Sequence, residues 1–221
     1  PAGFAPRGDG PSAQQAIGAF SELTASLFPA EGMVRPLAEG GLPVELVDRP
    51  DMGAEYYGLE FGREIKIFAS DPSGFLYGLI TLGQIWRGAH QHPETFSFLA
   101  SGFIVDGPRS RFRGSHLDVA RQFYSSSEVR QFIRLLAWNK MNRFHWHLSD
   151  DQGFRVESHT YPKLQQLGSD SLYYTQEQIR DVVAYAADRG IRVMPEFDVP
   201  GHSSSWFVGY PDLTVGSGPF A

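Results

Sequence analysis

The 221-residue chain contains no cysteine, which excludes disulfide bonds, thiol catalysis and zinc–thiolate sites. No apolar run approaches the ~20 residues that a membrane-spanning helix needs, so no membrane association is expected. Basic residues are scarce: 19 Lys and Arg stand against 25 Asp and Glu. With no basic tract, nucleic acid is not an expected partner. An initiator methionine and a signal-like segment are also missing, so we expect a processed or trimmed piece of unknown localisation.

Aromatic residues are abundant, at 14% of the chain, while hydrophobic residues make up 42% and charged residues 20%. These proportions are typical of a globular protein with a thick core. They also suit pockets whose walls stack on flat ligands.

Residues 1–107 are expected to form a small α+β domain. Its first ten residues hold three Gly and two Pro and should be irregular. Asp71 and Pro72 fit the N-cap and first position of a helix. The patterns predict a helix at 11–28, strands at 42–47, 55–62 and 63–69, a helix from 72 to about 86 and a strand pair at 96–106.

Residues 108–221 alternate between strand and helix patterns, which implies parallel strands and an α/β fold. The predicted strands are 111–119, 142–148 and 191–199. Two capping boxes, Ser125 with Glu128 and Thr175 with Gln178, begin the helices between them, and Gly190 suits a left-handed C-cap. The buried helix stripes are expected to be Val129, Phe132, Ile133 and Leu136, and then Ile179, Val182, Val183 and Ala186.

Polar residues gather at the carboxyl end of each of these three strands. The loops that follow parallel strands converge at one rim, where ligands bind in α/β folds. The convergence of three such ends indicates a site more strongly than any single residue does. The residues concerned are His116, Asp118 and Arg121; His145, His147, Asp150 and Asp151; and Glu196, Asp198 and His202.

Each of these residues also has a structural interpretation. Asp150 could cap the loop after its strand, Arg121 could form an ordinary ion pair, and His202 could be a surface loop residue. His145 and His147 share a face by the period of two and could be packed histidines. If the rim is functional, two chemistries compete. His145 and His147, with Asp150 and His202, could bind a divalent metal in a barrel-type metallohydrolase. Alternatively, Arg, Asp and aromatic groups could form a sugar pocket.

Five segments of the chain resemble glycoside hydrolase family 20, the β-N-acetylhexosaminidases. Residues 113–121, 139–152 and 195–202 are similar to the first three barrel strands of that family. Residues 174–190 are similar to its second barrel helix, and residues 71–86 to the helix of its preceding small domain. The resemblance covers most of the chain from about residue 42 onward. It implies a small α+β domain followed by the first three βα units of a (β/α)8 TIM barrel.

The resemblance also implies a reaction. Members of the family release terminal β-linked N-acetylglucosamine or N-acetylgalactosamine from glycans with retention, and the acetamido oxygen of the substrate acts as the nucleophile. An Asp-Glu pair orients the acetamide and protonates the leaving oxygen. Arg121 would bind hydroxyls of the terminal sugar, and Asp150 and His202 would support the general acid. The resemblance implies no metal and no cofactor.

The chain departs from the family pattern because it contains no Asp-Glu dipeptide. About 110 residues follow Arg111, whereas a complete barrel takes ~250 residues. We therefore expect an incomplete barrel that needs the remainder of the same enzyme and is inactive alone. A non-catalytic half-barrel that binds amino sugars is the alternative, and homodimerisation stays open.

Overall fold

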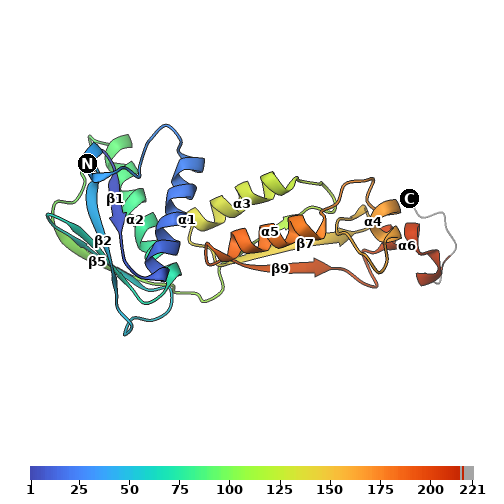
Figure 1. Cartoon of the computed structure of the whole chain (residues 1–221). Coiled ribbons are helices and arrows are strands. Elements are labelled where there is room, and N and C mark those ends of the chain that lie inside the picture. Colours follow the sequence, from blue (N-terminus) through green and yellow to red (C-terminus); the bar gives the residue numbers. More distant parts are fainter. Residues whose placement is uncertain (215, 217–221) are drawn as a thin grey trace. The chain divides into compact units, whose positions relative to one another are not determined.

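The computed structural model describes residues 1–214 and 216. The sequence of residues 216–221 predicts a loop, of which residues 217–221 lie outside the described residues. The chain forms two compact units: unit 1 is Pro1–Arg111 with Asp188–Gly190, and unit 2 is Phe112–Ala187 with the residues from Ile191 onward. Each unit has its own β-sheet (Figure 1). Within the described part of the chain, no helix combines the length and hydropathy needed to cross a bilayer.

Unit 1 is a five-stranded mixed sheet, in the order β1-β2-β4-β3-β5, packed against two helices (Figure 1). Its elements are β1 (Phe4–Arg7), α1 (Pro11–Leu27), a 3-10 turn (Leu37–Glu39), β2 (Leu42–Asp48), β3 (Tyr57–Phe61), β4 (Ile65–Ala69), α2 (Pro72–Gln91) and β5 (Gly102–Asp106). Alternate residues of the central strands, including Val44, Leu46 and Ile67, are buried. As predicted, Asp71 caps α2, and its Oδ1 accepts from the Gly74 N–H at 2.8 Å.

Two expectations for unit 1 are wrong. The first residues are not irregular, because Phe4 is fully buried and β1 pairs in parallel with β2. β1 lies at the edge of the sheet, where Pro6 is tolerated. The strand pair expected at 96–106 is the single strand β5. The chain before it forms a turn after α2, in which the Phe96 N–H donates to the His92 carbonyl at 2.9 Å.

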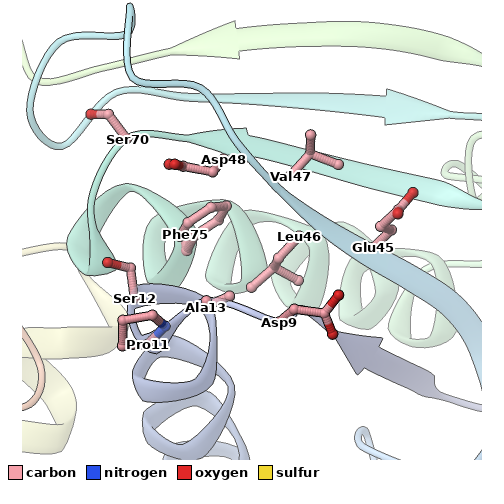
Figure 2. A pocket seen from close by; sticks show the side chains of 11 residues that line it. Asp9, Pro11, Ser12, Ala13, Glu45, Leu46, Val47, Asp48, Ser70 and Phe75 are labelled. Atoms are coloured by element: carbon pink, nitrogen blue, oxygen red, sulfur yellow. The ribbon is translucent and has the colours of Figure 1, made fainter.

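A hollow of about 440 Å³ lies in unit 1 between the end of β2 and the first turn of α1 (Figure 2). β1 pairs with β2 only as far as Glu45. The hollow lies where β2 continues beyond this pairing. Its lining combines three carboxylates with apolar side chains, among them Asp9, Glu45, Asp48, Leu46 and Phe75.

Unit 2 contains three parallel strands in the order β6-β7-β9, with a short antiparallel strand, β8, against the end of β7. Its elements are β6 (Gly114–Asp118), α3 (Ser126–Trp138), β7 (Arg143–Asp150), β8 (Gly153–Phe154), α4 (Lys163–Leu167), α5 (Gln176–Ala187), β9 (Arg192–Phe197), α6 (Ser204–Gly209) and a 3-10 turn (Pro211–Leu213). The predicted parallel alternation of strand and helix is confirmed.

β7 separates the core of unit 2 from the face that carries its polar side chains. Phe144, Trp146 and Leu148 are buried, and Phe144 packs on Phe132 of α3, with ring centroids 5.6 Å apart. His145 and His147 lie between them in the sequence and therefore on the opposite face. The helix borders follow the sequence signals: both capping boxes form, and Gly190 adopts a left-handed φ of 69°.

Three details of unit 2 differ from expectation. Val183, expected in the buried stripe of α5, is exposed. The first strand begins at Gly114 rather than residue 111 and ends at Asp118. β8 was not predicted, because a two-residue strand that pairs only with the end of β7 leaves no periodic pattern.

Candidate active site

The carboxyl ends of the three parallel strands lie at one edge of the unit 2 sheet. Asp118 at the end of β6 is the register partner of His147 on β7, and His147 is in turn the partner of Glu196 on β9. These side chains therefore share a face of the sheet. The loops that carry Arg121 and His202 follow β6 and β9 at the same edge. The structure thus brings together Arg121, Asp150 and His202, the three site residues that the sequence predicts.

Asp150, at the end of β7, is the centre of this cluster, and its side chain is only 2% exposed. Its Oδ2 lies 2.7 Å from Arg121 Nη2 and 2.9 Å from His147 Nε2. Its Oδ1 accepts from the Asp151 N–H at 2.7 Å and lies 3.2 Å from His202 Nδ1. Burial disfavours the charged carboxylate, but these donors outweigh burial and hold the pKa of Asp150 below its usual value. Asp150 is therefore ionised, and each of its two carboxylate oxygens has two nitrogen partners.

Arg121 bridges two carboxylates. Its Nη1 donates to Asp118 Oδ2, while its Nη2 contacts Asp150. Asp118 Oδ1 also accepts from the backbone N–H groups of Ala120 and Arg121, at 3.0 and 3.1 Å, which fixes the start of the loop. The hydrogen bond to Asp118 raises the pKa of Arg121. The Arg121 side chain is half exposed, so its guanidinium can also donate to a ligand.

His202 has a φ of 54°, in the left-handed region that non-glycine residues rarely adopt. Neighbouring contacts hold its loop against β7: Asp151 Oδ1 accepts from the backbone N–H and hydroxyl of Ser204, and the Ser205 hydroxyl donates to the Asp150 carbonyl at 2.6 Å. The imidazole is more than half exposed. One ring nitrogen faces Asp150, and the ring is accessible to a further group.

A second cluster lies beside the first, around Glu196 of β9, the register partner of His147. Glu196 Oε2 lies 2.8 Å from His147 Nδ1, 2.5 Å from His145 Nε2 and 3.8 Å from His116 Nε2. The contact with the His147 ring is the largest influence on Glu196 and lowers its pKa. The histidines that the period of two placed on one face therefore surround a single carboxylate.

One residue that positions the site was not predicted. Arg155 is buried, and its guanidinium donates to four backbone carbonyls, those of Val119, Ala120, Ser169 and Leu172. Two of these carbonyls directly precede Arg121 in the chain. The only signal in the sequence was a lone arginine beside the apolar residues of a short segment, which does not reveal its partners.

Some of these groups have the composition of metal ligands. Among the described residues, three triplets bring potential ligand atoms within 4.8 Å of one another: His116, His147 and Glu196; His147, Asp150 and Asp198; and Asp150, Asp151 and His202. Asp150 and Glu196 already lie at hydrogen-bond distance from nitrogen donors. We interpret the triplets as parts of one charge-compensated network and assign no ion to them.

The electrostatics of the cluster favour ligand binding over proton donation. The pKa values of the Asp118, Asp150, Asp151 and Glu196 carboxyl groups are all lowered. A general acid needs a raised pKa to hold its proton at neutral pH. These carboxylates instead orient Arg121 and His202, whose exposed groups can hydrogen bond to a polar ligand.

Comparisons with known proteins point to one family. Residues 111–219 match the family model for glycosyl hydrolase family 20, catalytic domain. Beta-hexosaminidase from Porphyromonas gingivalis is 34% identical over 206 residues, which span 81% of this chain and 26% of that protein. Beta-hexosaminidase subunit alpha from Rattus norvegicus is 42% identical over 190 residues, which span 81% of this chain and 35% of that protein.

Solved structures agree as well. A mutant Streptomyces plicatus beta-hexosaminidase in complex with product (GlcNAc) is 30% identical, with a TM-score of 0.82, over 100% of this chain and 47% of that one. An exo beta-N-acetylglucosaminidase from Vibrio harveyi in complex with N-acetylglucosamine is 30% identical, with a TM-score of 0.79, over 97% of this chain and 36% of that one.

The mixed α/β fold is thus that of solved family 20 glycoside hydrolases. The chain belongs to glycosyl hydrolase family 20. It spans about a quarter to a third of the length of the curated relatives described above.

Proposed function

We propose that the whole protein is an exo-acting β-N-acetylhexosaminidase and that this chain supplies part of the pocket for the terminal sugar. The observation that carries the proposal is the buried Asp150 carboxylate, which contacts Arg121 and His202 from the two neighbouring strand ends. A half-exposed guanidinium held by two carboxylates suits sugar hydroxyls, to which it can donate two hydrogen bonds.

In the proposed reaction, the acetamido oxygen of the substrate attacks the anomeric carbon, and the bond to the leaving oxygen breaks as a general acid protonates that oxygen. Arg121 binds hydroxyls of the terminal sugar. Asp150 orients Arg121 and His202, and His202 uses its accessible ring edge to support the acid. The lowered pKa values of the site carboxylates agree with an acid supplied from outside this chain, which has no Asp-Glu dipeptide.

The two units of this chain fit two domains of the proposed enzyme. We assign residues 1–107 to a small α+β domain and residues 108–221 to the first three βα units of a (β/α)8 barrel. Within the described residues, β9 pairs with β7 on one side only, and Met194 and Phe197 are exposed. An unpaired strand edge of this kind is normally covered. The remainder of the enzyme would cover it and close the barrel.

Hydrolysis of a chromogenic aryl N-acetyl-β-glucosaminide, and of its galacto isomer, tests the proposal. The full-length protein should release the chromophore, whereas the 221-residue chain alone should not. Arg121→Ala should lower kcat/KM on the order of 100-fold, because a charged hydrogen bond to the substrate is lost. The matched control is Arg180→Ala, in the exposed part of α5.

Three outcomes contradict the proposal. An unchanged kcat/KM for Arg121→Ala refutes the assigned role of Arg121. Binding of N-acetylglucosamine without hydrolysis by the full-length protein supports a non-catalytic amino-sugar-binding protein instead. Stoichiometric zinc or manganese in the purified protein, with activity that a chelator abolishes, supports a metallohydrolase centred on His145 and His147.

A further inference from the structure

His147 lies between two carboxylates that come from different strands. Its side chain is only 5% exposed. Nε2 lies 2.9 Å from Asp150 Oδ2, and Nδ1 lies 2.8 Å from Glu196 Oε2. Since His147 and Glu196 are register partners on adjacent parallel strands, the sheet itself sets this contact.

Two carboxylates at these distances determine the charge of the imidazole. A neutral imidazole has one N–H group and one lone pair, whereas an imidazolium has two N–H groups. A neutral ring would leave both carboxylates without a compensating charge. The imidazolium donates from Nε2 to Asp150, and at Nδ1, which makes no aligned hydrogen bond, its positive charge attracts Glu196 Oε2 at 2.8 Å.

The surroundings of His147 agree with a charged ring. Burial opposes the charge, but the nearby carboxylates of Glu196 and Asp150 outweigh burial and raise the pKa of His147. The carboxylate of Asp118 on β6 adds to this effect. His116 also faces it, with ring centroids 5.6 Å apart, and Asp198 offers a carboxylate oxygen within 4.8 Å.

We infer that His147, held as an imidazolium by Glu196, is a positioning residue that fixes the Asp150 carboxylate for Arg121 and His202. This inference rests on the proposed function, because it assigns Glu196 and His147 to the support of the same pocket. The supporting contacts run from Glu196 to His147, from His147 to Asp150, and from Asp150 to Arg121.

Asp150 needs this support because it is buried and charged. A buried carboxylate is stable only when donors compensate its charge. Arg121 is half exposed and shared with Asp118, so it compensates Asp150 only in part. His147 supplies a second donor, and its side chain is almost fully buried. Without it, Asp150 would lose one of the two side-chain donors to Oδ2 and with it the fixed orientation of that oxygen.

The experiment compares His147→Gln, Glu196→Gln and the double variant in the full-length protein. We expect kcat/KM to fall about 10- to 100-fold for His147→Gln, the range for a lost hydrogen bond between charged groups, and about 10-fold for Glu196→Gln. The double variant should be no worse than His147→Gln, because both changes break one path. The control is His159→Gln, whose side chain is 75% exposed and contacts Glu157.

A direct readout needs no substrate. The ¹⁵N shifts of histidine-labelled protein at pH 8, with the His147 signal assigned by its loss in His147→Gln, should show two protonated ring nitrogens. In Glu196→Gln the same ring should lose one of these protons, whereas a merely structural role of Glu196 predicts no change. Because turnover of the unmodified protein tests the proposed function separately, failure of either idea can be recognised.

The inference is overturned if a correctly folded single variant keeps kcat/KM within twofold of the unmodified protein. It is also overturned if the two losses multiply in the double variant, or if His147 carries one ring proton. Glu196→Gln preserves size and an acceptor oxygen. It therefore decides the question even if His147→Gln does not fold.

Discussion

Arg155 provides a test of what holds the loop before Arg121 in place. Its buried guanidinium donates from Nε to the Val119 carbonyl at 3.2 Å and from Nη2 to the Ala120 carbonyl at 2.7 Å. Nη1 donates to the carbonyls of Ser169 at 2.6 Å and Leu172 at 3.2 Å. Burial lowers the pKa of Arg155, so the hydrogen bonds have to offset the cost of burying its charge.

Arg155→Lys keeps the charge but cannot reproduce this planar arrangement of donors. If lysine satisfies two of the four carbonyls, two charged hydrogen bonds are lost. At about 1.5 kcal/mol each, the lower end of their usual range, the free energy of unfolding should fall by about 3 kcal/mol. In a cooperatively unfolding unit of about 150–250 residues that corresponds to a drop in Tm of roughly 6–12 °C, and the drop is smaller in a longer full-length protein. kcat/KM should fall as well, because Arg121 follows directly after the anchored Ala120.

Scanning calorimetry of the full-length protein, with kinetics on the same samples, measures both effects. Arg180→Lys, in the exposed part of α5, serves as the control and should leave Tm unchanged. A Tm for Arg155→Lys within 1 °C of the unmodified protein would show that the four carbonyls need no guanidinium. The account of the loop before Arg121 would then be wrong.

Two further predictions concern stability. Ser125→Ala removes the side-chain cap of α3, in which Ser125 Oγ accepts from the Glu128 N–H at 3.4 Å, and should cost about 1 kcal/mol in urea unfolding. Ser126→Ala, one position later, should cost only a few tenths, and equal losses would contradict the capping role. The lowered pKa of Asp150 contributes stability above its ordinary unfolded value of about 3.9. This contribution is lost as the pH falls through the lower folded value. The urea midpoint should therefore drop more steeply below about pH 4 in the unmodified protein than in Asp150→Asn, and parallel curves would refute the linkage.

The site at the strand ends could be predicted because the sequence patterns that indicate it are local. The alternation of strands and helices implied parallel strands, and parallel strands bring their carboxyl ends to one edge. Arg121, Asp150 and His202 follow three such strands, so their convergence needed no knowledge of distances. The capping boxes at Ser125 and Thr175 were equally local, since each lies within four residues.

Features that depend on partners distant in the sequence were missed. β1 contains Pro6 and lies between Gly3 and Gly8, like part of a loop, and only its pairing with β2 makes it a strand. Val183 follows the helical period of α5, yet period alone does not say whether a neighbouring element covers that position. Arg155 has partners up to 36 residues away, and its own segment does not indicate them.

The position of His147 shows where local reasoning stops. The period of two places it on one face with His145, and it places Glu196 on one face with Asp198. Whether His147 meets Glu196 or Asp198 depends on the register between β7 and β9, and a shift of one residue would exchange the faces. In the structure the register pairs His147 with Glu196 and becomes irregular immediately afterwards, between His147 and Ser149. The charge of the ring therefore follows from strand alignment, which neither strand specifies alone.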